Sequence, residues 1–261
     1  MRETVAANRS PLIWRRIDPR FDNGAAWRCS IGLLALATDM ACEAELPTYL
    51  SMPGVHFFSS RVAVDWRVDV AALHKLRINI RSAMDLLLPG RTPDVIALGC
   101  TAGAVAMGCE EVVSLIESAR PGARATTPMT AALKALSAFG ARRIALVTPY
   151  LPDVNALMAS FLQERGFELT SQATFEQPGD LEMNRIDPTQ IAEVCAQVAL
   201  PHCDAIFVSC AGLRTAAIID QVEAVTGRPV VTSIQAMAWD CLRLAGVHDK
   251  LDGVGMLLRC H

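Results

Sequence analysis

Two short segments of this chain each run from an aspartate through an apolar stretch to a cysteine. The first covers 94–100 (DVIALGC) and continues with Thr-Ala-Gly, and the second covers 204–210 (DAIFVSC) and continues with Ala-Gly. Apolar runs of this length are typical of buried strands, and the small residues that follow predict a turn that opens a helix. We therefore expect Cys100 and Cys210 each to lie at the carboxyl end of a strand and at the start of a helix.

A thiol in that position suits acid-base and nucleophilic chemistry. The positive end of a helix and its unpaired N–H groups are expected to lower the thiol pKa and favour the thiolate. Two thiols on opposite faces of one carbon could remove a proton and return it on the other side; alternatively, one thiolate could add to a double bond while the other thiol donates a proton. Neither route needs a metal or an organic cofactor. Backbone donors that could hold a substrate carboxylate are those of Thr101, Ala102 and Gly103 after the first cysteine and of Ala211 and Gly212 after the second.

The competing interpretation is that both cysteines are inert core residues, since free cysteine is commonly buried. The duplication of the segment favours function. The chain has nine cysteines, an odd number without Cys-x-x-Cys spacing, which argues against a disulfide framework and a zinc site and for a reducing cytoplasm. No metal site is expected. The five histidines form no recognisable catalytic triad; they are His56, His74, His202, His248 and His261.

The elements that must position these thiols alternate between strand-like and helix-like patterns, which predicts an α/β fold with parallel sheets. The predicted strands are 29–37, 55–62, 94–99, 143–148, 167–175, 205–209 and 229–232. The predicted helices are 40–50, 69–88, 103–119, 128–139, 153–165, 188–199, 213–226 and 234–245.

The repeat extends beyond the cysteines. A glycine and a threonine with the same spacing follow each of them, namely Gly122 with Thr127 and Gly227 with Thr232. Two related α/β halves explain this pattern. Ligands of open α/β sheets bind beyond the carboxyl ends of the strands, so facing halves would place both cysteines across one cleft. The two threonines could line that cleft, although strand packing also accounts for them.

Composition excludes several classes of function. The 261-residue chain is 52% hydrophobic with a net charge of −3, which gives it a sizeable core and no basic face for nucleic acid. No apolar run is long enough to span a bilayer. Residues 1–27 are polar and arginine-rich, which is not a secretory signal, and we interpret them as a surface extension or partner-contacting arm. This arm favours a homodimer.

The motifs resemble a known family. Residues that carry the resemblance are Gly32 to Asp39, Gly99-Cys100-Thr101, Thr148-Pro149-Tyr150 with Asn155, Ser209-Cys210 with Leu213-Arg214-Thr215, and Gln235-Ala236 with Ala238-Trp239. They resemble the aspartate/glutamate racemase superfamily, in the branch of maleate cis-trans isomerase and arylmalonate decarboxylase, and most of all the racemase-like group of ectoine-utilisation clusters.

The resemblance implies two pseudo-symmetric Rossmann-like (flavodoxin-like) domains with the active site between them. The first domain would cover 28–127 with 234–261, and the second 128–233. In the isomerases, the cysteine that matches Cys100 is the nucleophile and the one that matches Cys210 supplies a proton. A tyrosine that matches Tyr150 contacts a substrate carboxylate, and the resemblance also places Thr38 at the substrate.

Three departures narrow the substrate. Decarboxylases of this branch lack the first cysteine, so Cys100 argues against simple decarboxylation. Glutamate racemases carry Cys-Asn-Thr and Cys-Thr-His where this chain has Cys-Thr-Ala and Cys-Ala-Gly. Asp39 stands where maleate isomerases have a carboxylate-binding asparagine, and an anionic side chain there would repel a second carboxylate and suit an amino or amidine group. The alternative role of Asp39 is to cap a helix.

The sequence therefore predicts a racemase or isomerase of a small, amino-acid-like or ectoine-derived carboxylate that needs no cofactor and works through Cys100 and Cys210. One alternative is covalent cis-trans isomerisation of the maleate type, with Cys100 as nucleophile. The other is a non-catalytic carboxylate sensor that uses the same cleft. Arg214 could clamp a carboxylate, although an arginine at such a position is more often solvated.

Overall fold

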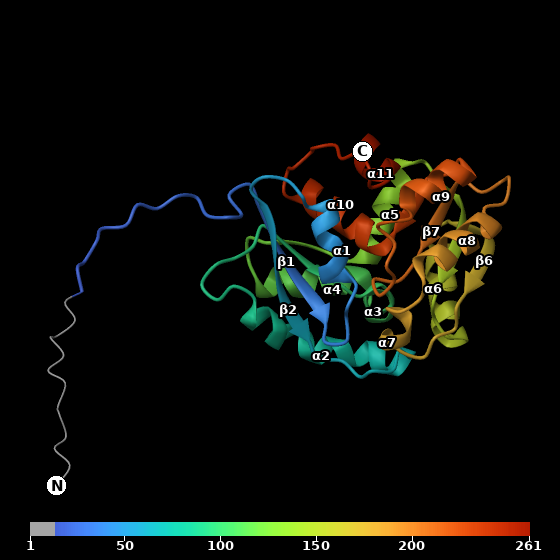
Figure 1. The fold of residues 1–261 in the computed structure, drawn as a ribbon. Coiled ribbons are helices and arrows are strands. Elements are labelled where there is room, and N and C mark those ends of the chain that lie inside the picture. The colour runs from blue at the N-terminus through green and yellow to red at the C-terminus, as the bar shows by residue number, and fades with distance from the viewer. Residues whose placement is uncertain (1–13) are drawn as a thin grey trace, which may run out of the picture.

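Two four-stranded parallel sheets form the framework of the protein (Figure 1). The structure, a computed structural model, describes residues 14–261. Within that range the strands are β1 (Cys29–Leu36), β2 (Val55–Val62), β3 (Val95–Leu98), β4 (Arg124–Thr126), β5 (Arg143–Thr148), β6 (Glu168–Thr174), β7 (Ala205–Val208) and β8 (Val230–Thr232). The strand orders are β2-β1-β3-β4 and β6-β5-β7-β8, so the second sheet repeats the first strand for strand. The predicted α/β class with two related halves is confirmed.

Helices connect the strands as parallel pairing requires. Their bounds are α1 (Cys42–Tyr49), α2 (Val70–Leu86), α3 (Thr101–Met107), α4 (Cys109–Ala119), α5 (Pro128–Ala138), α6 (Pro152–Glu164), α7 (Asp180–Met183), α8 (Pro188–Val198), α9 (Ile219–Thr226), α10 (Ser233–Leu244) and α11 (Met256–Cys260). Several begin at a side-chain cap that sequence patterns favour, such as Thr127 before Pro128 in α5.

Two predicted helices differ from the structure. The helix predicted over 103–119 is two helices, because Gly108 adopts a φ of +87° and ends α3 there. The helix predicted over 213–226 begins only at Ile219, so that Cys210 is followed by turns rather than by a helix. The repeat therefore holds in the order of its strands and breaks down directly after its second cysteine.

The central strands are fully buried, and helices from both halves meet over them. Every residue of β1, β3 and β7 is buried. On α10, the buried carboxylate of Asp240 accepts hydrogen bonds from Lys134 Nζ of α5 at 2.8 and 2.9 Å and from Thr126 Oγ1 of β4 at 2.6 Å. These hydrogen bonds connect α10 to the first sheet. The predicted domain boundaries stay a prediction.

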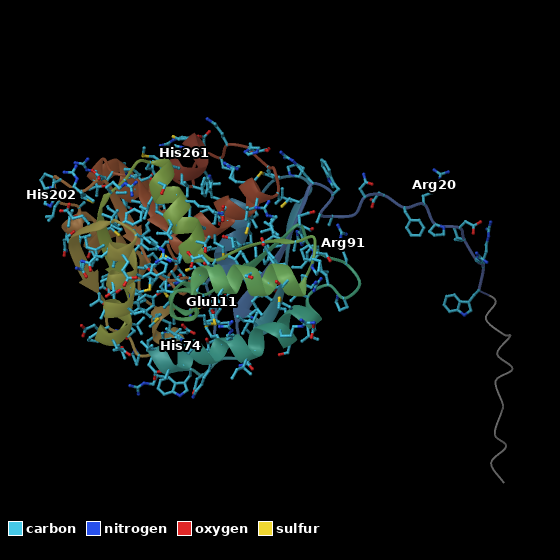
Figure 2. The ribbon with its side chains drawn as sticks, turned by 180° about the vertical axis from the view of Figure 1, so that it is seen from behind. Arg20, His74, Arg91, Glu111, His202 and His261 are labelled. Atoms are coloured by element: carbon cyan, nitrogen blue, oxygen red, sulfur yellow. The ribbon has the colours of Figure 1, made fainter. Side chains whose placement is uncertain are left out.

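The segment before β1 runs away from the body of the protein, as the position of Arg20 in Figure 2 shows. Its large apolar side chains are exposed, with Trp14 90% and Phe21 91% accessible. The predicted extension includes residues 1–13, which lie outside the described part of the chain, and its role as an arm that contacts a partner stays a prediction. No helix between residues 14 and 261 combines the length and the apolar character needed to cross a bilayer.

Candidate active site

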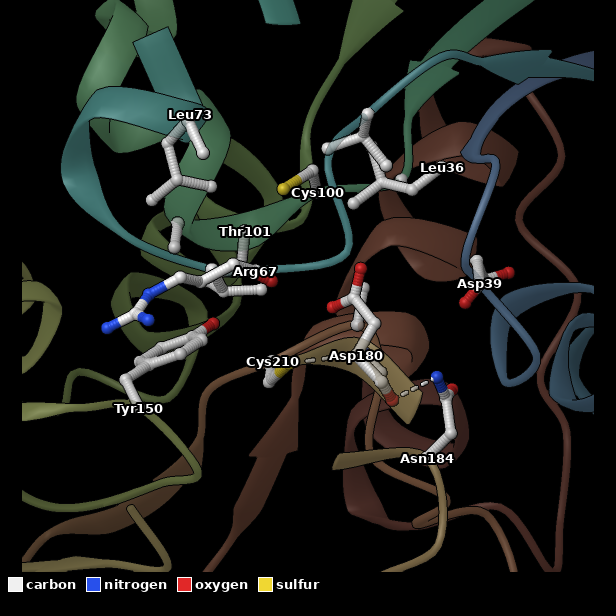
Figure 3. A pocket seen from close by; sticks show the side chains of 17 residues that line it. Leu36, Asp39, Arg67, Leu73, Cys100, Thr101, Tyr150, Asp180, Asn184 and Cys210 are labelled. Carbon is white, nitrogen blue, oxygen red and sulfur yellow. Dashed lines mark hydrogen bonds between the residues drawn. The ribbon is translucent and has the colours of Figure 1, made fainter. Parts of the chain in front are cut away.

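A small, partly enclosed pocket lies beyond the carboxyl ends of β3 and β7 (Figure 3). Eight of the nine predicted site residues line it, and Thr38 does not. These eight are Asp39, Cys100, Thr101, Ala102, Tyr150, Cys210, Ala211 and Gly212. The cavity volume is about 30 Å³, which is room for one or two water molecules. The structure thus brings the two repeated cysteines into one pocket.

The turn that carries Cys100 leads directly into a helix. Cys100 has extended backbone angles and precedes α3, and its Sγ accepts a hydrogen bond from the N–H of Gly103 at 3.3 Å. The side chain therefore acts as the amino-terminal cap of its own helix. A thiol at this cap is held by the first turn of α3, as the sequence predicts.

The turn that carries Cys210 has a different form. Its Sγ accepts a hydrogen bond from the N–H of Gly212 at 3.2 Å, two residues on rather than three. The segment 211–218 that follows contains turns, and α9 starts after it. Both sulfur atoms nevertheless receive one backbone donor each from the small residue that follows.

Ser233 joins the two cysteine turns. Its buried Oγ accepts a hydrogen bond from the N–H of Cys210 at 3.0 Å and another from Thr101 Oγ1 at 2.9 Å. Ser233 is the first residue of α10, so a single hydroxyl group contacts the turns from both sheets. This contact fixes the spacing of the two thiols through one side chain that sequence motifs did not single out.

Burial raises the pKa of both thiols above that of free cysteine. Burial, with Asp180 as the next cause, raises the pKa of Cys210 to about 12. The same two causes raise the pKa of Cys100 further still. The N–H groups of Gly103 and Gly212 act in the opposite direction, but the loss of water around the sulfur atoms outweighs them. The N–H groups of the turns thus lower the thiol pKa as expected, but the expected net fall is wrong, because burial raises the pKa by more.

Tyr150 supplies a neutral hydroxyl group to the pocket. Burial, followed by the charges that Cys210 and Cys100 would carry as thiolates, raises the pKa of Tyr150 well above its usual value. Asn155 supports this residue, because its Nδ2 donates to the backbone oxygen of Tyr150 at 2.7 Å and to Thr174 Oγ1 at 3.1 Å. The tyrosine of the Thr-Pro-Tyr motif thus reaches the pocket, and the asparagine of that motif positions it.

Asp39 lines the pocket, but its carboxyl group accepts hydrogen bonds from backbone N–H groups. Its Oδ1 accepts from the N–H groups of Ala41 and Cys42 at 3.2 and 3.1 Å, at the start of α1. Burial raises the pKa of Asp39 despite these donors. In Figure 3 the carboxyl group is turned toward the start of α1. Of its two predicted roles, the structure establishes the one at the helix start, and contact with substrate stays a prediction.

A second buried carboxyl group, Asp180, was missed by sequence reasoning. Asp180 begins α7, is only 7% exposed and lines the pocket. Thr38 Oγ1 donates to its Oδ2, so the predicted site residue Thr38 supports the wall of the pocket from outside it. Asn184 joins the same two segments through a hydrogen bond to the Asp180 carbonyl group and another from Met40 N–H at 3.3 Å. An acidic residue in a first helical turn is common, which is why Asp180 carried no signal.

Loops from the two halves close the pocket against each other. Val68 N–H donates to the carbonyl oxygen of Pro178 at 2.9 Å, and Arg67 pairs with Gly179 in an isolated antiparallel bridge. A Cβ atom on Gly179 would lie 2.6 Å from the carbonyl oxygen of Trp66, so the two backbones approach as closely as glycine allows. We call the segments 66–68 and 178–180 the clasp. Three residues of the clasp, Arg67, Val68 and Asp180, line the pocket.

Other predicted candidates lie outside the pocket. Arg214 is exposed and donates to the carbonyl oxygen of Ile186 at 3.2 Å. Thr127 and Thr232 cap α5 and α10 instead of lining the cleft. All five histidines are exposed, and Figure 2 shows three of them, His74, His202 and His261, at the periphery. Among residues 14–261 no cluster of three or more metal-ligating side chains occurs.

Comparison with known proteins adds chemistry to this geometry. A sequence model described as arylmalonate decarboxylase matches residues 64–258. The arylmalonate decarboxylase of Bordetella bronchiseptica is 41% identical over 127 residues, which cover 48% of this chain and 53% of that protein. The aligned part thus spans about half the length of that relative. The maleate isomerase of Pseudomonas putida is 26% identical over 250 residues, or 87% of this chain and 96% of that protein.

A solved structure supports the same arrangement. A cysteine-to-serine mutant of Nocardia farcinica maleate cis-trans isomerase, with a covalently bound succinylcysteine intermediate, has a TM-score of 0.83 at 23% identity. The superposition covers 89% of this chain and 99% of that chain. At this identity the likeness establishes the fold, two parallel α/β halves, and it is independent of the motifs.

Proposed function

The chain belongs to the arylmalonate decarboxylase family of enzymes, and from this premise we propose that it is an isomerase or racemase of a small carboxylate that works through Cys100 and Cys210. The observation that carries the proposal is that both thiols line one pocket whose lining contains no histidine or lysine. Asp39 and Asp180 also line the pocket, but the two cysteines are the pair that the repeat places at equivalent positions, so we assign proton transfer at a substrate carbon to them.

In the leading reaction the thiols act on opposite faces of the α-carbon. One sulfur, as thiolate, takes the α-proton, and the negative charge spreads onto the substrate carboxylate. The other thiol then gives its proton to the opposite face. The product has inverted configuration, and the two sulfur atoms have exchanged their protonation states. The hydroxyl group of Tyr150 and the N–H groups of the two turns supply hydrogen bonds to the carboxylate while charge develops there.

Because burial raises the pKa of both thiols, the first thiolate forms when the substrate binds, and the thiol proton leaves with the water that the substrate displaces. The substrate displaces the water of the pocket and changes the charge beside both sulfur atoms. A small carboxylate of the amino-acid or ectoine-derived kind fits this requirement, and its amino or amidine group would face the acidic side of the pocket.

A second reaction has its own supporting observation, the succinylcysteine found in the Nocardia farcinica protein. Here the Cys100 thiolate adds to a carbon-carbon double bond while the Cys210 thiol gives its proton to the neighbouring carbon. Rotation about the resulting single bond, return of a proton to Cys210 and breakage of the C–S bond complete a cis-trans isomerisation. No atom is gained or lost.

One experiment in heavy water separates these reactions. The protein is incubated with a panel of amino-acid and ectoine-pathway carboxylates, and deuterium at the α-carbon and mass adducts on cysteine are measured. We expect exchange that falls by about a hundredfold or more in both Cys100→Ser and Cys210→Ser, with Cys260→Ser, an exposed cysteine, as the matched control. An adduct on Cys100 without exchange would favour the covalent reaction. Ligand binding without either result would leave a sensor.

A further inference from the structure

Asp180 presents an unpaired oxygen to the reacting groups. Its carboxyl group points into the pocket toward the space between Cys100 and Cys210 (Figure 3). Only 7% of the residue is exposed, and Thr38 Oγ1 donates to Oδ2. In the described part of the chain no side-chain or backbone donor reaches Oδ1, which is therefore available to a ligand. Unlike Asp39, whose carboxylate accepts hydrogen bonds from α1, Asp180 keeps half of its hydrogen-bonding capacity for the pocket.

Within residues 14–261 no cationic side chain pairs with Asp180. Arg67, which also lines the pocket, approaches Asp69 at 3.6 Å, and in Figure 3 its guanidinium group points away from Asp180. A buried carboxylate without a cation is costly, and a partner from outside the chain would remove that cost.

The charges of the pocket favour a zwitterion over a dicarboxylate. The lining of the pocket includes two carboxyl groups, those of Asp39 and Asp180, and one guanidinium group, that of Arg67. A ligand with two carboxylates would place a negative charge against this acidic side, at a distance where like charges repel strongly. A ligand with one carboxylate and one cation meets opposite charge at both ends, with Arg67 and Tyr150 on one side and Asp180 on the other.

We propose that Asp180 binds a cationic group of the substrate, so that the small carboxylate of this enzyme also carries an ammonium or amidinium group. The inference rests on the proposed function for the identity of the site and goes beyond it by assigning the residue that selects the substrate.

The same contact would prepare the thiols for reaction. After burial, the negative charge of Asp180 is the largest cause that raises the pKa of Cys100 and of Cys210. A cation seated on Asp180 cancels that charge, and the pKa of both thiols then falls. A substrate without the cation could enter the pocket, but both thiols would then stay protonated. The contact with Asp180 therefore selects the substrate both when it binds and when the thiolate forms.

Charged thiol reagents test the proposal without a known substrate. The aminoethyl (cationic) and sulfonatoethyl (anionic) methanethiosulfonates react with Cys100 and Cys210 of the full chain at pH 8, and the rates are read from the masses of the two peptides. The ratio of the cationic rate to the anionic rate cancels any change in thiolate fraction. We expect Asp180→Asn to lower this ratio about tenfold.

Glu182→Gln is the matched control, because it removes the same charge from the same helix at an exposed position. The ratio should stay at the wild-type value in this variant. An unchanged ratio in Asp180→Asn, or an equal fall in Glu182→Gln, would overturn the proposal. A circular-dichroism melting curve of each variant establishes that the fold is intact.

Aspartate and succinate, which differ by one amino group, provide the second measurement. Their protection of the two thiols from iodoacetamide is compared in wild type and in Asp180→Asn. The proposal is supported if aspartate protects the wild-type thiols more strongly than succinate does and this advantage disappears in Asp180→Asn. It is overturned if succinate protects the wild-type thiols as strongly as aspartate or more strongly. Neither measurement needs turnover, so a failed deuterium exchange would refute the proposed reaction and leave this result standing.

Discussion

The two cysteine turns begin alike and are held in place by different means. Each follows a buried central strand, accepts one N–H donor at sulfur and contacts Ser233. The Cys100 turn continues into α3, whereas the Cys210 turn is held from the other half by Glu45 of α1, whose Oε1 accepts from Ala216 N–H at 3.0 Å. The first thiol is thus fixed by its own helix, and the second depends on how the halves fit together.

The space beside the two sulfur atoms also differs. A Cβ atom on Gly103 would lie 2.6 Å from Leu76 Cδ1 and 2.7 Å from Cys100 Sγ. On Gly212 it would lie 3.4 Å from Cys210 Sγ, an ordinary contact. The first turn is packed to its limit, and the second has room to adjust. A reaction that uses one thiol on each face of the substrate does not require the two turns to be packed equally, so two unequal thiols can still carry it out.

We expect the difference between the Cys100 and Cys210 turns to have its largest effect on the rate at which each thiol is alkylated. The raised pKa of both thiols means that only a small fraction is thiolate at neutral pH, and that fraction grows tenfold for each pH unit below the pKa. We expect iodoacetamide labelling of Cys210, whose pKa is about 12, to speed up about a hundredfold from pH 8 to pH 10. Cys100 should label more slowly throughout. A rate that levels off below pH 9 would contradict the burial argument.

Alanine at the two glycines should break the symmetry in stability. Gly103→Ala is expected to lower the free energy of unfolding by about 1–3 kcal/mol, because the new methyl group overlaps a leucine side chain and the sulfur. Gly212→Ala should cost little. Urea unfolding of both variants measures the difference. Equal costs would show that the packing of the two turns is the same in solution.

Loss of the shared hydroxyl group should have the smallest effect and should reach both turns. Ser233→Ala leaves the buried N–H of Cys210 without its acceptor, and we expect a loss of about 1–2 kcal/mol of unfolding free energy. Ser209→Ala is the control, since the Ser209 hydroxyl is buried without a hydrogen-bond partner. A Ser233 variant as stable as this control would rule out the link between the turns.

Sequence patterns were sufficient for the framework because buried parallel strands have a strong signal. The strands that end at Cys100 and Cys210 were predicted to within a residue, and the pocket lies beyond them as topology requires. β4 was not singled out, since three residues with one of them exposed carry little pattern. The helix predicted directly after Cys210 failed because helical periodicity in 213–226 does not reveal where the first turn forms.

The site was predictable where chemistry is tied to a repeat and not where it depends on contacts across the halves. The thiols and Tyr150 belong to motifs at strand ends. Asp180, Ser233 and Asn184 act through partners more than 20 residues away, such as Thr38 for Asp180. Their local sequence is that of an ordinary helix start or turn. The burial that raises the thiol pKa could not be predicted either, because it depends on the segments that pack around the pocket and not on the turns alone.

The clasp has a consequence for isotopes. With room for one or two water molecules, a hydrogen taken from the substrate has almost no solvent with which to mix while Val68 and Pro178 remain joined. We therefore expect the enzyme to keep an isotopic memory: a labelled hydrogen that one sulfur has accepted can be handed on to the next substrate before it washes out. The extent of that carry-over measures how far the hydrogen on sulfur exchanges with solvent in each catalytic cycle.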